Sequence, residues 1–110
     1  MANKFGIPQE VEARLRQKFK LCAYCRLPMQ EHTGVKGSPR DKATIEHLNL
    51  DGPFYWAKGL KEEDLVLCCG SCNSSRGQKI LIEWFASEYC KQKGITANTV
   101  ADEVKQYLGR

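Results

Sequence analysis

The chain has 110 residues, a formal net charge of +4 at pH 7 and six cysteines. A chain of this length forms one domain with a small core, so we treat residues 1–110 as a single domain. There is no apolar run of about 18 residues and no signal-peptide-like segment after Met1, which argues against a membrane protein and predicts a cytoplasmic one. Because thiols stay reduced in that compartment, we expect metal-binding or buried cysteines rather than disulfides.

The positive charge is concentrated in the first part of the chain. Residues 1–42 hold nine Lys or Arg against four acids, whereas residues 43–110 hold eight against nine. A basic region is typical of a protein that binds a polyanion, most often nucleic acid. A solvated surface explains the same excess equally well.

An N-terminal basic helix is predicted within residues 1–20, from Pro8 to about Phe19. Proline suits the first helical turn, and Val11, Leu15 and Phe19 recur every four residues. Cations near the C-terminal end of a helix are favoured by its dipole, and they can also contact phosphate. These cations are Arg14, Arg16, Lys18 and Lys20.

Two cysteine pairs share the spacing Cys-x-x-Cys: Cys22 with Cys25, and Cys69 with Cys72. This spacing lets both sulfurs of one turn face a single ion, and two such pairs supply the four ligands of a structural zinc site. A redox dithiol is the alternative for either pair alone. Between the pairs lie 43 residues, where an ordinary zinc ribbon has about 15 to 20. The excess predicts a module inserted between them.

Two cysteines fall outside this pattern. Cys68 offers a competing ligand position, but strand alternation turns it away from Cys69, and Cys69 repeats the spacing of the first pair. We expect Cys68 and Cys90 to be buried, unreactive thiols.

Residues 30–42 have the composition of a loop. His32 lies in this loop and follows a glutamate, as His47 does, so the Glu-His dipeptide by itself is not specific. His47 differs because it ends a β-prone run. The loop cations, which can face solvent or phosphate, are Lys36, Arg40 and Lys42.

Two strands are predicted, over residues 43–48 and 64–69, joined by a long loop at 49–63. The loop contains Phe54, Tyr55 and Trp56. These rings can stack on nucleic-acid bases, but under a long loop a small satellite core is the favoured interpretation.

After the second strand, the pattern predicts one helix over residues 73–93, stopped by Gly94. A final helix is expected from about Asn98 to Leu108, within residues 94–110 and capped by Thr96 or Asn98. Trp84 and Phe85 are interpreted as core. The apolar face of the first of these helices comprises Ile80, Leu81, Ile82, Trp84, Phe85, Ala86 and Tyr89.

The order of these features resembles the HNH, or ββα-metal, endonuclease family. The matching motifs are Thr44-Ile45-Glu46-His47-Leu48, Asp64-Leu65-Val66-Leu67-Cys68-Cys69 and Cys72-Asn73-x-x-Arg76-Gly77. The subgroup it looks most like carries a zinc clamp of two Cys-x-x-Cys pairs. The resemblance implies an α+β fold, with a zinc-clamped ββα core over residues 21–93 between N- and C-terminal helices.

The resemblance also implies roles for individual residues in phosphodiester hydrolysis of DNA that leaves a 5′ phosphate and a 3′ hydroxyl. His47 matches the general base, and Glu46 and Asn73 match the ligands of a catalytic Mg²⁺ or Mn²⁺. Arg76 matches a phosphate-binding position, with Lys79 a weaker candidate. No membrane and no small-molecule cofactor is implied. One site per chain nicks one strand, so cutting both strands requires a homodimer or two encounters.

Two departures from the family pattern accompany the match. The acidic ligand is Glu46 where the family more often has Asp, and Asp64 stands where the signature has Asn. Asp64 can accept the hydrogen bonds that fix the loop but cannot donate them. Adjacent strand residues also point to opposite faces, so Glu46 and His47 can serve one phosphate only where the strand is ending.

Simpler interpretations compete with this one. Asn73 is a good helix N-cap, His47 suits a hydrogen-bonded core position, and Arg76 suits a solvated helix face. A non-catalytic zinc-ribbon module that binds DNA would need the four cysteines but not Glu46 or His47. A zinc domain that binds other proteins is a third reading, and it would show no salt-dependent DNA binding.

Overall fold

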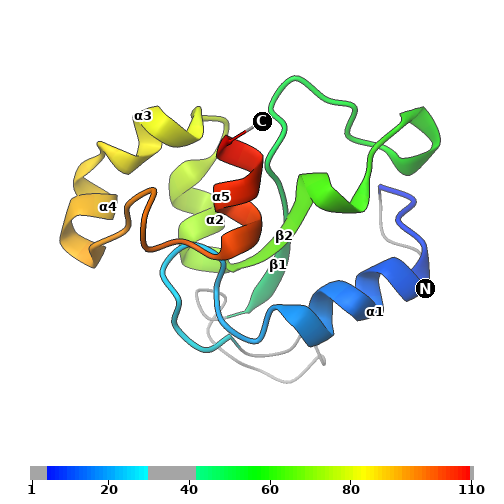
Figure 1. Cartoon of the computed structure of the whole chain (residues 1–110), viewed down its shortest axis with the longest axis horizontal. Coiled ribbons are helices and arrows are strands. Elements are labelled where there is room, and N and C mark those ends of the chain that lie inside the picture. Colours follow the sequence, from blue (N-terminus) through cyan, green and yellow to red (C-terminus); the bar gives the residue numbers. More distant parts are fainter. Residues whose placement is uncertain (1–4, 30–41, 110) are drawn as a thin grey trace.

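The computed structural model describes residues 5–29 and 42–109 as a small α+β domain (Figure 1). This agrees with the predicted α+β class, while the ββα-metal core stays a prediction. Within these residues, a two-stranded sheet is surrounded by short helices. In chain order the elements are α1 (Gln9–Lys18), β1 (Ala43–His47), η1 (Trp56–Lys58), η2 (Glu62–Asp64), β2 (Leu65–Cys69), α2 (Gly70–Arg76), α3 (Leu81–Phe85), α4 (Glu88–Lys93) and α5 (Asp102–Leu108).

The sheet is an antiparallel pair whose strands lie where the sequence predicts them, to within one residue. Ala43 is opposite Cys69 and His47 is opposite Leu65. Side chains alternate between faces along each strand, and directly opposed residues share a face. One face therefore carries Thr44, Glu46, Val66 and Cys68, and the other carries Ala43, Ile45, His47, Leu65 and Leu67.

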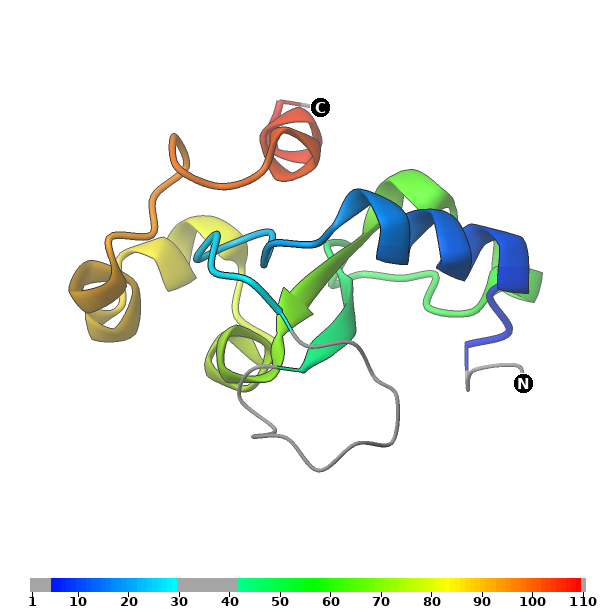
Figure 2. The ribbon, with the colours of Figure 1, turned by 90° about the horizontal axis from the view of Figure 1, so that it is seen from below.

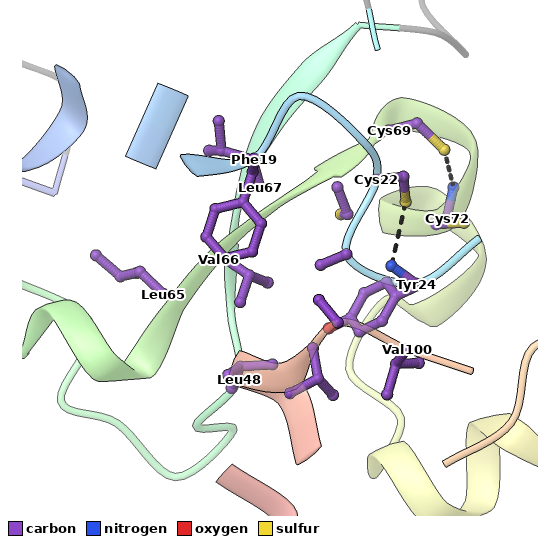
Figure 3. Packing of buried hydrophobic residues seen from close by; sticks show 14 of the residues in the cluster. Phe19, Cys22, Tyr24, Leu48, Leu65, Val66, Leu67, Cys69, Cys72 and Val100 are labelled. Carbon is purple, nitrogen blue, oxygen red and sulfur yellow. Dashed lines mark hydrogen bonds between the residues drawn. The ribbon is translucent and has the colours of Figure 1, made fainter. Parts of the chain in front are cut away.

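Helices cover the sheet from two sides. In both views α1 and α2 lie on opposite sides of the strand pair (Figures 1 and 2). Val11 and Leu15 of α1 are buried, as is Phe19, which lines the same small pocket as Leu67 of β2 (Figure 3). Burying an aliphatic side chain of this size stabilises a fold by about 1.5–3 kcal/mol. The apolar repeat that predicted this helix is therefore its packing face.

The cations of α1 lie near acidic groups. Three of the four predicted cations form ion pairs, two of them with acids of other elements, and such exposed pairs typically contribute about 0.2–1 kcal/mol. This favours packing over phosphate binding for that surface. The pairs are Arg14 with Glu62 at 2.8 Å, Arg16 with Glu12 at 3.4 Å and Lys18 with Glu103 at 3.8 Å.

The single helix predicted over residues 73–93 is wrong, because this segment forms the rest of α2 and two further helices. α2 begins earlier, at Gly70, and ends before Gly77, whose φ is +52°. A second break precedes α4, where the Ser87 side chain accepts a hydrogen bond from the Cys90 N–H. Gly94 does end α4, in a left-handed conformation, as predicted.

The breaks also divide the predicted apolar face. Leu81 and Trp84 are buried, whereas Ile80 and Ile82 are 57% and 60% exposed. A continuous helix would place them on one broad stripe, but α3 is one short turn with its own direction. The prediction of a core role is confirmed for Trp84, and Phe85 packs against the core while partly exposed.

The C-terminal helix is shorter than predicted. It begins at Asp102 with Ala101 as N-cap, and neither Thr96 nor Asn98 caps it. Thr96 instead closes a turn, in which its backbone N–H donates to the Thr99 hydroxyl at 2.8 Å. Serine, threonine and asparagine side chains stabilise such turns as well as helix caps, which explains the misassigned start.

The aromatic run in the long loop is only partly a satellite core. Trp56 packs against the core, but Phe54 and Tyr55 are 42% and 53% exposed. Within the described residues, none of the helices combines the length and apolar composition needed to cross a lipid bilayer.

Candidate metal centre and active site

Four cysteines from two distant parts of the chain meet in one cluster, as the sequence predicts. The sulfurs of Cys22, Cys25, Cys69 and Cys72 all lie within 4.8 Å of one another. Four sulfurs at the usual zinc distance of about 2.3 Å are separated by about 3.8 Å at tetrahedral geometry, and the Cys25 and Cys69 sulfurs are 3.9 Å apart. The cluster is compatible with a structural zinc ion.

Backbone amides support this cluster. The N–H groups of Tyr24 and Cys25 donate to the Cys22 sulfur at 3.4 Å, and the Cys72 N–H donates to the Cys69 sulfur at 3.5 Å (Figure 3). Donors of this kind orient metal ligands and stabilise thiolates. The x2 spacing thus positions both the sulfurs and the amides that support them.

The first cysteine pair lies in a tight turn attached to β2. A bridge between Leu21 and Pro28 closes the turn, and Arg26 adopts a φ of +64° within it. The Ala23 N–H donates to the Leu67 carbonyl at 3.0 Å, and the Ala101 N–H donates to the Ala23 carbonyl at 2.8 Å. These bonds hold the turn between the sheet and the start of α5.

The sulfurs of the cluster influence one another's ionisation. Hydrogen bonds from Cys25, Cys69 and Cys72 lower the pKa of the Cys22 thiol, while the contact with Cys22 raises the pKa of Cys72. The ionisation of each cysteine in the cluster therefore depends on its neighbours. Zinc binding displaces protons from thiols, so its affinity depends on pH.

The two remaining cysteines are buried and lie apart from the cluster, as predicted. Cys68 faces the other way, with its sulfur 3.7 Å from the Thr44 hydroxyl oxygen, and burial raises the pKa of its thiol. Burial also raises the pKa of Cys90. The choice of Cys69 over Cys68 as cluster ligand is confirmed.

Glu46 points toward α2 and the first cysteine turn. It is 5% exposed, and its Oε2 accepts hydrogen bonds from the Tyr24 hydroxyl and from Nη1 of Arg76, both at 2.8 Å. Burial raises the pKa of Glu46, although the Arg76 guanidinium and the Tyr24 hydroxyl act in the opposite direction. The carboxyl group is held rigidly on one side.

Arg76 is not on the surface, so the interpretation of it as a solvated helix residue is wrong. It is 1% exposed, and its contact with phosphate stays a prediction. Its guanidinium is surrounded by acceptors, as a buried cation requires. Besides Glu46, the acceptors are the carbonyls of Lys79 at 2.9 Å, His47 at 2.8 Å and Leu48 at 3.3 Å.

The other residues predicted to contact phosphate differ in their exposure to solvent. Lys79 is exposed and its Nζ donates to the Ser75 carbonyl at 3.0 Å. Lys42 is half-buried, and its carbonyl accepts from the Gly70 N–H at 3.0 Å. Arg40 lies outside the described residues, as does His32.

His47 is the last residue of β1 and points away from Glu46, on the opposite face. Its side chain is half-buried, and Nε2 lies 3.1 Å from the Phe54 carbonyl oxygen. The rings of Phe5 and Phe54 pack edge-on against it, with centroids 4.3 and 5.8 Å away. The imidazole is oriented by these neighbours without being sealed in the core.

Asn73 lies inside α2 and connects this helix to β1. Its Nδ2 donates to the Thr44 hydroxyl at 3.0 Å and to the Ile45 carbonyl at 3.5 Å. Asn73 is not the N-cap of the helix, because Cys69 occupies that position. The amide therefore lies against the strand that carries Glu46.

Asp64 forms hydrogen bonds at the end of the long loop. Its Oδ2 accepts from the Lys61 N–H at 3.2 Å, and its carbonyl accepts from the Leu48 N–H at 2.8 Å. Accepting is the role that a carboxylate retains where asparagine would also donate.

Sequence reasoning missed the role of Tyr24. Its side chain is fully buried, its ring contacts Trp84 at 4.9 Å, and its hydroxyl reaches Glu46. No sequence signal distinguishes it, because the Cys-x-x-Cys spacing does not specify the residues between the cysteines. Only the fold brings this hydroxyl to a carboxylate 22 positions away.

A scan against protein-family models, a search of curated proteins and a search of solved structures each found no match to this chain.

Proposed function

We propose that this protein is a metal-dependent DNA endonuclease of the ββα-metal type, which hydrolyses phosphodiester bonds. The main support is one arrangement: α2 follows β2 directly, and Asn73 of α2 bonds to β1, the strand that carries Glu46 and His47. The four-cysteine cluster fastens the junction of β2 and α2 to the first cysteine turn. The order of these elements along the chain is the one that the sequence resemblance implies.

Glu46 and Asn73 offer hard oxygen ligands, the type preferred by Mg²⁺ and Mn²⁺. Such an ion stabilises negative charge on a phosphate and on the departing 3′ oxygen. Asn73 uses its amide nitrogen to bond to β1, which orients its oxygen away from those acceptors. Glu46 would provide the charged ligand of the pair.

His47 would remove a proton from the attacking water. An imidazole that donates Nε2–H to the Phe54 carbonyl leaves Nδ1 as the basic nitrogen. The edge-on rings of Phe5 and Phe54 limit its rotation. A general base of this kind contributes about 10²–10⁴ to the rate.

A non-catalytic zinc module that binds DNA is the second candidate. The observation in its favour is the buried ion pair between Glu46 and Arg76, since a carboxylate paired inside the fold suits a structural role. This alternative assigns no chemistry to His47.

Nicking of supercoiled plasmid distinguishes the two functions. The zinc-loaded protein is incubated with and without added Mg²⁺ or Mn²⁺, rather than with a chelator, because a chelator would also remove zinc. We expect nicked circles only with the added ion, and a rate loss of about 100-fold or more for His47→Ala.

His32→Ala is the matched control, since His32 is the chain's other histidine and also follows a glutamate. It should cut like the wild type. Equal cutting by His47→Ala would remove His47 from the mechanism, and DNA binding without cutting would support the zinc module.

A further inference from the structure

The two oxygens of Glu46 have different surroundings. Oε2 accepts from both the Tyr24 hydroxyl and Arg76, each at 2.8 Å. Among the described residues, no hydrogen bond involves Oε1. When one oxygen of a carboxylate is held by hydrogen bonds, the orientation of the second oxygen is fixed as well, and the second oxygen can bind a different partner.

The two groups that grip Glu46 are themselves fixed. Arg76 is 1% exposed and donates to three backbone carbonyls as well as to Glu46, so its guanidinium has little freedom. Tyr24 is 0% exposed, and its ring packs against Trp84, itself 0% exposed. Neither group is exposed to solvent.

Tyr24 also lies within the turn that carries the first two cysteines of the cluster. It lies between Cys22 and Cys25, and its backbone N–H donates to the Cys22 sulfur at 3.4 Å. Its side chain and its backbone therefore join the cluster to Glu46 within a single residue. Any shift of the first cysteine turn moves the hydroxyl that orients the carboxylate.

We propose that Tyr24 and Arg76 are positioning residues, which hold Oε2 of Glu46 so that Oε1 faces the catalytic divalent ion, and that Tyr24 couples the cysteine cluster to that ion. This inference rests on the proposed function, because it assigns Glu46 as a ligand. Groups that orient metal ligands from the second layer typically change metal affinity or activity by 10–100-fold when removed.

Tyr24→Phe is the direct test, since it removes one hydroxyl and keeps the ring against Trp84. Tyr89→Phe is its matched control: the Tyr89 hydroxyl donates to the Cys72 sulfur at 3.4 Å, so it contacts the cluster but not Glu46. Both variants are compared with the wild type for zinc content, thermal midpoint, Mn²⁺ affinity by titration, and plasmid nicking. A purely structural role would not change Mn²⁺ affinity.

We expect Tyr24→Phe to keep one zinc per chain and to bind Mn²⁺ about tenfold more weakly, with a matching loss of nicking at limiting Mn²⁺. Tyr89→Phe should bind Mn²⁺ and nick like the wild type. In a Glu46→Ala background, adding Tyr24→Phe should cause no further loss of Mn²⁺ affinity, because the carboxylate that it orients is gone.

The inference is overturned if Tyr24→Phe, with zinc retained, binds Mn²⁺ and nicks as the wild type does. It is also overturned if Tyr89→Phe weakens Mn²⁺ binding equally, since the effect would then come from the cluster alone. A wild type that neither binds Mn²⁺ at this site nor nicks DNA would instead overturn the proposed function itself. Arg76→Lys provides a second variant, which keeps the charge but loses the fork of donors.

Discussion

At the scale of single residues, the buried pair of Glu46 and Arg76 has the largest consequence. Each charge lies inside the fold and is satisfied by the other together with neutral partners. Removing one partner of a buried pair leaves an uncompensated charge, which typically costs about 3–5 kcal/mol. The pair therefore joins α2 to β1 whether or not the site is catalytic.

Arg76→Met should lower the free energy of unfolding by about 3–5 kcal/mol near neutral pH. Burial already raises the pKa of Glu46, and losing the guanidinium, which lowers that pKa, will raise it further. A carboxyl group whose pKa is raised by folding stabilises the folded state at pH values below its pKa in the unfolded chain, which is about 4.3. This stabilisation is lost as pH rises through the pKa of the folded state. The deficit of the variant should therefore grow as pH rises, and it is compared at pH 6 and pH 8.

Urea denaturation at the two pH values, with zinc in excess, measures this effect. The double variant Glu46→Gln/Arg76→Met is the control, because it has no titratable carboxyl group at position 46. Its loss of unfolding free energy relative to the wild type should therefore change less with pH than that of Arg76→Met. A loss of less than about 1 kcal/mol in Arg76→Met is typical of an exposed ion pair. Such a small loss would contradict the burial of the pair of Glu46 and Arg76.

The adjacent cysteines provide a second residue-scale prediction. Cys69→Ala should abolish stoichiometric zinc binding, since its sulfur belongs to the cluster, whereas Cys68→Ala should retain one zinc per chain because its sulfur faces Thr44. Zinc content of the purified variants by elemental analysis checks this. If both variants lose zinc while Cys68→Ala remains folded, the assignment of Cys69 rather than Cys68 as the zinc ligand is wrong.

At the scale of elements, the break after α2 sets where the following helices pack. Gly77 combines a φ of +52° with a ψ of −124°, a region that side-chain-bearing residues rarely adopt, while Gly94 has the ordinary left-handed values of 72° and 29°. A Cβ at Gly77 would meet no atom closer than 3.9 Å, so its cost would be backbone strain rather than a clash.

Gly94→Ala should cost about 1–2 kcal/mol, the usual penalty for a left-handed residue. Gly77→Ala should cost more, up to about 3 kcal/mol, because its conformation is rarer. Thermal denaturation of both variants, each loaded with zinc, makes the comparison. Equal or reversed losses would mean that the turn after α2 relaxes easily.

The elements also show how far sequence reasoning reaches. Both strands were located to within one residue, because five-residue β-prone runs bounded by turn residues leave few alternatives. The sequence pattern predicts a single helix after β2 although the structure has two breaks there. Helical periodicity does not reveal a residue such as Ser87, which caps a new helix within the same apolar pattern. Periodicity predicts an apolar face but not where the axis changes direction.

The site was predictable to a different degree at each position. The four cysteines were identified because metal ligands require fixed spacings. The burial of Arg76 and the contact of Tyr24 with Glu46 were not, because both depend on how α2 and the first cysteine turn pack against β1. Whether an arginine faces phosphate or a buried carboxylate is decided by tertiary structure alone.

At the scale of the whole molecule, the sheet has two strands and the helices are short within the part of the chain that the structure describes. The cysteine cluster therefore joins segments that share little other secondary structure. Structural zinc sites typically supply about 10–16 kcal/mol of apparent binding energy, which exceeds the stability of many small domains. We therefore expect a zinc ion bound at this cluster to contribute a large share of the stability of the fold.

Removing zinc with a strong chelator should unfold the chain cooperatively, and adding zinc back should refold it. Because zinc displaces protons from the thiols, the zinc concentration required should rise as pH is lowered from 8 to 6. Circular dichroism during zinc titration follows both effects. A zinc-free chain with an unchanged spectrum and thermal midpoint would contradict a structural role for the cluster.

The most direct test of the central claim is the chemistry of the nick. Supercoiled plasmid is treated with zinc-loaded protein and Mg²⁺, and the nicked circles are then incubated with DNA ligase. We predict nicks that require Mg²⁺ and His47 and that ligase reseals, because the proposed hydrolysis would leave a 5′ phosphate and a 3′ hydroxyl. An intact plasmid, or nicking that persists unchanged in His47→Ala, would contradict the assignment of a ββα-metal active site.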